Sequence, residues 1–234
     1  MKILSIGNSF SEDAQRYLHR IAETNGKKLT CANLYIGGCS LKQHYINLSD
    51  NEKSYDFQFN GENTNIKISI KDAVKSNTWD YITLQQASHE SFDINNYMPY
   101  IESITKWLRL RCPDTKILLH QTWAYPQNRE RLSEMGFKTT EDMFAAVKDA
   151  YSKAEKLINA DDMIKSGEAM IKAYRLNPDI VYRDAIHASY GFGRYLIGCV
   201  WYKALFNEKP TIQIGNFDEN ITDEGLNLIT DIIR

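Results

Sequence analysis

Short apolar runs alternate along this chain with longer segments whose apolar residues recur at helical spacing. The first run, residues 2–6, precedes a helical pattern over residues 11–25 that ends at Gly26. Further strands are expected at 29–36, 79–84, 116–120 and 162–165, and helices at 41–50, 98–111, 140–159, 167–174, 190–206 and 223–233. Strands that alternate with helices pair in parallel, so we predict an α/β fold. The expected form is a three-layer α/β/α sandwich with a central parallel sheet of about five strands.

A β-hairpin interrupts this alternation after the second strand. Residues 54–59 and 66–70 alternate between apolar and polar positions, and Asn60-Gly61 between them is typical of a tight hairpin turn. We expect this small insertion, near residues 54–70, to form a flap. The length of 234 residues suits one domain, and no repeat or low-complexity linker divides the chain, so we expect a single domain over residues 1–234.

Composition and charge exclude several classes of function. Apolar residues make up 43% of the chain and charged residues 25%, and the formal net charge is −2. A charge so close to zero, without a basic run, provides no electrostatic footprint for nucleic acid or for an anionic membrane surface. No apolar stretch approaches the roughly 18 residues of a membrane span. The four cysteines show neither a CxxC nor a zinc spacing, which favours free thiols.

The first residues of the chain bear on its cellular compartment. Polar residues follow directly after the first strand, where a secretory signal needs a longer apolar run. We therefore expect a cytoplasmic location. A periplasmic or secreted location would follow instead if an export segment has been removed.

Small and polar residues stand where three of the predicted strands end. They are Gly7-Asn8-Ser9, Gly37-Gly38 and Gln85-Gln86. Sites in open parallel sheets lie at the carboxyl ends of the strands, so these segments are the first candidates for a functional site. Far downstream, Asp184 and His187 stand three residues apart in the stretch YRDAIHASYGFGRY.

These segments resemble, in the same order, the sequence blocks of the SGNH (GDSL-like) hydrolases, and within them a poorly characterised bacterial branch. Gly7-Asn8-Ser9-Phe10-Ser11 resembles the nucleophile block, with Asn8 where many members carry Asp. Gly38 resembles the glycine block, Gln85 stands where the third block lies, and Asp184-Ala185-Ile186-His187 resembles the terminal DxxH block. The resemblance covers most of the chain and implies a single SGNH-hydrolase-like domain.

The resemblance implies a role for each residue, and the chemistry of ester cleavage explains why these residue types are needed. A serine hydroxyl is a poor nucleophile until a base removes its proton, so His187 would activate Ser9. Asp184 would hold the imidazole in one tautomer and stabilise the imidazolium, with both residues on one short helical turn. The backbone N–H groups of Ser9 and Gly38 and the Gln85 amide would stabilise the oxyanion.

The third block departs from the family pattern of Gly-x-Asn-Asp. The chain has Leu84-Gln85-Gln86-Ala87-Ser88-His89 there, and an ungapped match from Asp80 places His89 at the Asn position. We favour Gln85, because some carbohydrate-esterase relatives use a Gln amide in this role. Gln86 and His89 stay open as alternatives, and each of the two glutamines could equally be a satisfied buried amide. Trp123 could form a stacking platform for a sugar ring, or belong to the core or a lid.

Simpler explanations exist for several of these residues. Ser9-Phe10-Ser11-Glu12 fits a helix capping box, although Ser11 can cap in its place. Cys39 beside Gly38 has no nearby base motif and is set aside as a nucleophile. His44, His89 and His120 do not show a metal-ligand spacing, so we expect no metal and no other cofactor.

The sequence thus predicts a serine esterase that works through an acyl-enzyme on Ser9. The resemblance implies small acyl esters as substrates, with O-acetyl groups on carbohydrates as the expected class. Alternatives are a thioesterase or lysophospholipase of the same superfamily, a non-catalytic carbohydrate-binding relative, or anion binding at the first helix. The non-catalytic alternative would be favoured if Ser9 and His187 lay on separate faces.

Overall fold

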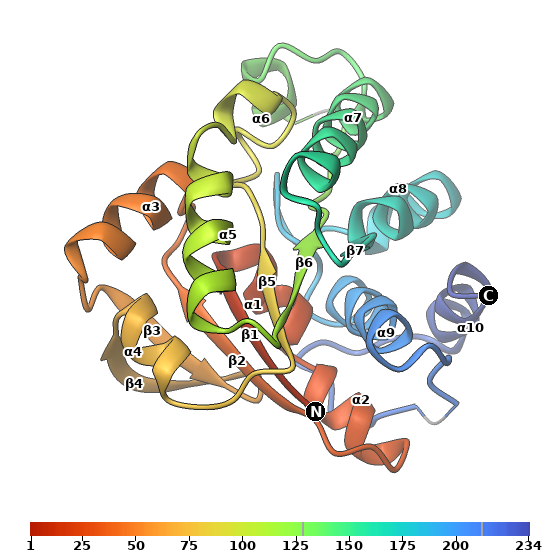
Figure 1. The fold of residues 1–234 in the computed structure, drawn as a ribbon. Helices are drawn as coiled ribbons and strands as arrows, with labels where there is room; N and C mark the ends of the chain where they lie inside the picture. Colours follow the sequence, from red (N-terminus) through yellow and green to blue (C-terminus); the bar gives the residue numbers. More distant parts are fainter. Residues whose placement is uncertain (128, 212) are drawn as a thin grey trace.

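A seven-stranded sheet forms the centre of the computed structural model, which describes residues 1–127, 129–211 and 213–234 (Figure 1). The strand order is β4-β3-β2-β1-β5-β6-β7. The parallel part consists of β2 (Thr30–Tyr35), β1 (Lys2–Gly7), β5 (Tyr81–Leu84), β6 (Lys116–His120) and β7 (Asp162–Ile164). This part agrees with the parallel sheet that the alternating sequence pattern predicts.

The predicted hairpin extends this sheet and does not form a flap. Its strands are β3 (Tyr55–Phe59) and β4 (Glu62–Ile68), and β3 pairs with β2 in the antiparallel direction, from Ala32 opposite Phe59 to Tyr35 opposite Asp56. The free backbone groups along the edge of β2 need partners, and β3 supplies them. The pattern of the hairpin was recognisable in the sequence, but its place beside β2 was not.

Two groups of helices cover the sheet. One group consists of α1 (Ser9–Gln15), α2 (Leu18–Thr24), α8 (Ser166–Leu176), α9 (Phe192–Phe206) and α10 (Asp223–Ile232), in which α9 contacts each of the others. The other contains α3 (Leu41–Asp50), α5 (Tyr100–Arg111) and α7 (Thr140–Ile158), with α5 in the middle. Right-handed crossovers to opposite sides of β1 put the two groups on opposite faces (Figure 1).

Four short helices complete the secondary structure: α4 (Ile70–Lys75), η1 (Ile94–Asn96), α6 (Glu130–Glu134) and η2 (Pro178–Ile180). Within the described residues, none of the helices combines the length and the apolar character needed to cross a membrane.

The helix expected over residues 11–25 is two helices. The first begins at Ser9, earlier than expected, because Asn8 provides its cap. The break falls at Arg16 and Tyr17, between α1 and α2. The Tyr17 hydroxyl donates a hydrogen bond to the Tyr190 carbonyl (2.7 Å) and accepts one from the Asp218 backbone N–H (2.7 Å). These contacts with the C-terminal third of the chain explain why a periodicity read from local sequence missed the break.

The chain leaves β1 and β5 toward opposite sides of the sheet. Ile6 and Leu84 pair at the carboxyl ends of these neighbouring strands, so the turns that begin at Gly7 and Gln85 emerge side by side. In open α/β sheets, ligand sites lie at such switch points, outside the carboxyl ends of the strands. This position is where the candidate residues from the first and third sequence blocks lie.

Candidate active site

The chain turns from β1 into α1 at Asn8, and Ser9 is the first residue of the helix. Asn8 Oδ1 accepts a hydrogen bond from the backbone N–H of Phe10 (3.0 Å), and the Ser11 hydroxyl accepts one from the backbone N–H of Asn8 (3.1 Å). Gly7 is required before this turn, because a Cβ atom there would lie 2.2 Å from Ser11 Oγ. Asn8 and Ser11 thus cap the helix, and the Ser9 hydroxyl is free to bind another partner.

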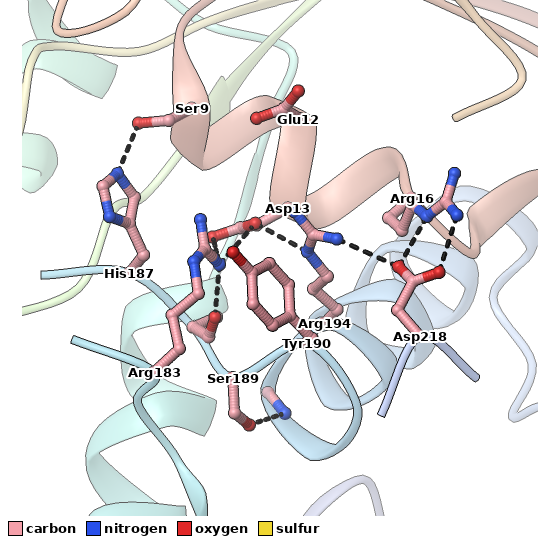
Figure 2. A network of polar contacts seen from close by, with 12 residues as sticks. Ser9, Glu12, Asp13, Arg16, Arg183, His187, Ser189, Tyr190, Arg194 and Asp218 are labelled. Atoms are coloured by element: carbon pink, nitrogen blue, oxygen red, sulfur yellow. Dashed lines mark hydrogen bonds and ion pairs between the residues drawn. The ribbon is translucent and has the colours of Figure 1, made fainter. Parts of the chain in front are cut away.

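The partner of the Ser9 hydroxyl is His187. Figure 2 shows the Ser9 hydroxyl and the His187 ring pointing toward each other. Ser9 Oγ lies 2.9 Å from His187 Nε2, and His187 Nδ1 lies 2.8 Å from Asp184 Oδ2. An ionised carboxylate only accepts hydrogen bonds, so His187 donates its Nδ1–H to Asp184 and keeps Nε2 as the acceptor for the Ser9 hydroxyl. The structure therefore brings together a hydroxyl, a base and an acid that orients the base.

The surroundings of Asp184 favour its ionised form. Partial burial on its own would raise the pKa of this carboxyl group. Hydrogen bonds from the backbone N–H groups of His187 (2.7 Å) and Ile186 (2.8 Å), together with the His187 side chain, outweigh burial and lower the pKa below its ordinary value. Asp184 is therefore a carboxylate at neutral pH, as the orientation of His187 requires.

Asp184 and His187 lie in a closed loop and not on the helical turn that their spacing suggested. An antiparallel bridge between Tyr182 and Ala188 closes the loop, and the Arg183 backbone N–H donates to the His187 carbonyl (3.1 Å). The following helix, α9, begins only at Phe192. The loop folds so tightly that a three-residue spacing still lets the two side chains meet.

Trp123 supports this loop from below and does not provide a surface for a sugar. Its side chain is fully buried, and its Nε1–H donates to the carbonyl of Ile186 (2.9 Å). Phe10 stacks on Trp123 with 3.9 Å between ring centroids, and the His187 ring meets the edge of Phe10 at 6.0 Å. The interpretation of Trp123 as a stacking platform is therefore corrected: it is part of the core beneath the site.

A buried carboxylate joins α1, which begins at Ser9, to the closed loop that carries His187. Asp13 on α1 has no exposed side-chain surface and accepts hydrogen bonds from Arg183 Nη1 (2.9 Å) and Arg194 Nε (2.8 Å) (Figure 2). Arg194 also contacts Asp218 (3.0 Å), to which Arg16 binds (2.6 Å). This network fixes the position of α1 relative to the base-bearing loop and to α9.

The turn after β2 carries Gly38 in a conformation that favours glycine. Its φ is +64°, and the turn is closed by a hydrogen bond from the Cys39 N–H to the Ile36 carbonyl (3.2 Å). Asn8 Nδ2 donates to the Cys39 carbonyl (3.1 Å), which links this turn to the residue before Ser9. Among the described residues, the backbone N–H groups of Ser9 and Gly38 have no protein acceptor.

Gln85 lies beneath Ser9, and its amide is engaged by other side chains. Its Nε2 donates to Asn8 Oδ1 (2.7 Å), and its Oε1 lies 2.6 Å from His120 Nδ1. Only 1% of Gln85 is exposed. Gln85 therefore contacts the residue before the nucleophile, and the prediction that its amide meets an oxyanion stays untested.

Gln86 and His89 have other surroundings. Gln86 is fully buried; its Oε1 accepts from the backbone N–H of Leu41 (2.8 Å), and its Nε2 donates to the Asn96 carbonyl (2.8 Å). His89 is partly exposed and lies 3.8 Å from Glu90. In the described part of the chain neither side chain hydrogen-bonds to Ser9, His187 or Asp184, and the prediction that one of them meets an oxyanion stays untested.

Cys39 has a histidine beside it that the sequence spacing did not suggest. Its Sγ lies 3.4 Å from His44 Nδ1, and both residues are buried. Burial raises the pKa of Cys39 to about 12 and lowers the pKa of His44 to about 3. The thiol therefore stays protonated and the imidazole neutral, which excludes this pair as an activated nucleophile.

Sequence reasoning missed three polar residues of this region: Asp13, Arg183 and His120. Arg183 directly precedes Asp184 in the sequence. Asp13 lies one helical turn after Ser9, and its carboxylate is a weak signal for an ion pair with Arg183. His120 ends the predicted fourth strand, so the rule on strand ends could have included it. The contacts of these residues span 35 to 181 positions and are not visible in local patterns.

Comparisons with known proteins identify the family of the chain. A family model described as "Domain of unknown function (DUF4886)" matches residues 2–222. The chain is similar to a crystal structure of a DUF4886 family protein from Bacteroides uniformis, with 31% identity and a TM-score of 0.91 over 100% of this chain and 93% of that chain. No curated protein matches the chain.

More distant solved structures share the fold. A candidate SGNH hydrolase from Slackia heliotrinireducens has a TM-score of 0.65 at 18% identity, over 88% of this chain and 98% of its own. The psychrotrophic esterase EstA from Pseudoalteromonas has a TM-score of 0.56 at 13% identity, over 88% of this chain and 99% of its own. These likenesses confirm the predicted SGNH-type fold.

Proposed function

The chain belongs to the DUF4886 family, and we propose that it is a serine esterase that cleaves small acyl esters. One observation carries the proposal: hydrogen bonds of 2.9 and 2.8 Å connect Ser9 to His187 and His187 to Asp184. A serine that only caps a helix needs no such partners. Separate faces for Ser9 and His187 would have favoured a binding domain without turnover, and their contact at 2.9 Å supports the esterase instead.

In the acylation step, Ser9 Oγ attacks the carbonyl carbon of the ester while His187 Nε2 takes the hydroxyl proton. The carbonyl π electrons move to oxygen and form a tetrahedral oxyanion. When this intermediate collapses, the bond to the alkoxy group breaks, and His187 returns the proton to the leaving alcohol. Ser9 then carries the acyl group, and Asp184 has stabilised the transient imidazolium throughout.

In the deacylation step, a water molecule takes the place of the alcohol. His187 removes a proton from this water, which attacks the acyl carbon on Ser9 and forms a second oxyanion. Collapse breaks the bond to Ser9 Oγ, and His187 returns the proton to it. The products are a carboxylic acid and the free enzyme, so atoms and charge balance without a cofactor.

We assign stabilisation of the oxyanion to the backbone N–H groups of Ser9 and Gly38. Both groups lack a protein acceptor within the described residues, and Asn8 holds the two turns that carry them. A preorganised donor of this kind typically contributes about 10²–10³ in rate. The Gln85 amide, which sequence analysis placed in this role, is already bonded to Asn8 and His120.

As substrates we propose O-acetyl esters of carbohydrates, the class that the resemblance to SGNH carbohydrate esterases implies. Peracetylated xylose and p-nitrophenyl acetate are suitable substrates, and p-nitrophenyl palmitate, palmitoyl-CoA and lysophosphatidylcholine test the alternatives. Preference for the acetyl esters supports the proposal. Preference for a long acyl chain would favour the thioesterase or lysophospholipase alternative.

The central variants are Ser9→Ala and His187→Ala. Each removes one partner of the 2.9 Å hydrogen bond, and we expect kcat for p-nitrophenyl acetate to fall by about 10⁴-fold or more. Ser49→Ala is a matched control, because among the described residues the Ser49 hydroxyl bonds only to the carbonyl of Tyr45 in its own helix. Activity that survives Ser9→Ala, or falls equally in the control, would contradict the mechanism.

A further inference from the structure

A series of buried side chains connects α9 to the residue that precedes Ser9. Trp201 Nε1 lies 3.2 Å from Ser166 Oγ, which lies 3.0 Å from His120 Nε2. His120 Nδ1 lies 2.6 Å from Gln85 Oε1, and Gln85 Nε2 lies 2.7 Å from Asn8 Oδ1. None of the five residues is more than 2% exposed. We call this series the Asn8 support chain.

Two backbone contacts identify which atom of the Asn8 carboxamide is the oxygen and which is the nitrogen, at one end of the Asn8 support chain. Its oxygen faces the N–H of Phe10, which only donates, and its nitrogen faces the carbonyl of Cys39, which only accepts. Rotating the carboxamide by 180° would place its NH₂ group against the N–H of Phe10, and its oxygen against the carbonyl of Cys39. The atom of Gln85 that faces Asn8 Oδ1 is therefore the amide nitrogen.

The same reasoning fixes each remaining hydrogen bond. Gln85 Oε1 is an acceptor, so His120 Nδ1 carries a proton and donates to it. His120 is neutral because burial lowers its pKa to about 3, so its Nε2 accepts the Ser166 hydroxyl proton. Ser166 Oγ in turn accepts the indole N–H of Trp201. Only one direction of donation satisfies every member of the Asn8 support chain.

We propose that His120 and Gln85 are positioning residues that fix the Asn8 carboxamide and, through it, the two backbone N–H groups of the oxyanion site. Asn8 bonds to the N–H that follows Ser9 and to the carbonyl that follows Gly38, so its orientation sets the spacing of the turns that carry both donors. The catalytic part of this inference rests on the proposed esterase function.

Two substitutions of His120 test the roles of its two ring nitrogens separately. His120→Asn places an amide nitrogen near the position of Nδ1 and keeps a donor for Gln85, whereas His120→Gln reaches toward Ser166 and leaves Gln85 without one. We expect kcat to fall about tenfold to a hundredfold in His120→Gln with KM little changed, because misplaced oxyanion donors weaken only the transition state. His120→Asn is expected to stay within a few-fold of the wild type.

Two NMR measurements test the Asn8 support chain without relying on activity. The ¹⁵N shifts of the His120 ring should report a neutral Nδ1–H tautomer. Amide hydrogen exchange should show the Phe10 N–H protected in the wild type and in His120→Asn, and less protected in His120→Gln. Gln85→Met, which keeps the side-chain length and removes both hydrogen bonds, should behave like His120→Gln and is the second disrupting variant if that protein does not fold.

The outcomes distinguish this inference from the proposed function. An Nε2–H tautomer, or equal Phe10 exchange and equal kcat in folded His120→Asn and His120→Gln, would overturn the inference while wild-type hydrolysis still upheld the esterase. A wild type with the expected tautomer and exchange pattern but no hydrolysis would refute the esterase and retain the positioning of Asn8.

Discussion

At the scale of single residues, capping of α1 and the contact with His187 are made by different residues around Ser9. Asn8 and Ser11 cap α1 through the backbone N–H groups of Phe10 and Asn8, which leaves the Ser9 hydroxyl for His187. The contacts of Ser9, His187 and Asp184 could be predicted from the sequence, because these three residue types have few common functions when they occur in the order of the family's sequence blocks. The sequence did not allow a prediction of the partners of the Gln85 amide, since an amide can donate or accept and only its neighbours decide which.

The role of Asp184 can be tested with a substitution that keeps its shape. Asp184→Asn replaces the acceptor of the His187 Nδ1–H with an amide that can present a donor, so His187 can adopt the wrong tautomer. We expect kcat for p-nitrophenyl acetate to fall by about 10⁴-fold while the protein stays folded. A loss of less than tenfold would show that Asp184 does not orient the base.

The lowered pKa of Asp184 also predicts a pH dependence of stability. Above the ordinary value of 3.8 the folded carboxylate keeps its hydrogen bonds, and this stabilisation is lost as the pH falls through the lower folded value. The difference in free energy of unfolding between the wild type and Asp184→Asn should therefore be larger at pH 6 than below about pH 3. Urea unfolding at both pH values measures it, and a difference that grows toward acid pH would contradict the lowered pKa.

At the scale of elements, the buried pairs of Asp13 hold α1, the base-bearing loop and α9 together. Asp13→Asn removes the buried carboxylate that Arg183 and Arg194 share, although Arg194 keeps its contact with Asp218; the two arginines are only 15% and 10% exposed. Removing one partner of such a pair typically costs about 3–5 kcal/mol, and we expect the free energy of unfolding to fall by that amount, together with kcat.

Asp149→Asn is the matched control, because Asp149 and its partner Lys153 are 62% and 56% exposed. An exposed pair is worth about 0–1 kcal/mol, so urea unfolding should separate the two variants clearly. Equal effects of Asp13→Asn and Asp149→Asn would mean that the buried network does not hold these elements together.

The types of the helices and strands were more predictable from the sequence than their boundaries. Long amphipathic helices such as α7 show a periodicity over many residues, and it is the long run that makes the signal reliable. The break between α1 and α2 depends on Tyr17 contacts with residues about 170 to 200 positions away, and the place of the hairpin depends on the free edge of β2. Neither cause is contained in the local sequence.

At the scale of the whole molecule, the topology brings the first and the last of the sequence blocks together. β1 and β5 lie side by side (Figure 1), and the loop before α9 brings His187 to Ser9 at the carboxyl end of β1. Ser9 and His187 are 178 positions apart and meet at 2.9 Å. The α/β alternation was sufficient to predict this edge of the sheet as the site, whereas the distances required the packed structure.

The most direct test of the central claim is to map the residue that reacts with a fluorophosphonate. An activated Ser9 should form one covalent adduct per chain, found by mass spectrometry on the peptide that contains Ser9, and the adduct should be absent in Ser9→Ala and much slower to form in His187→Ala. An unlabelled wild type, or an adduct on another residue that persists in Ser9→Ala, would contradict the account.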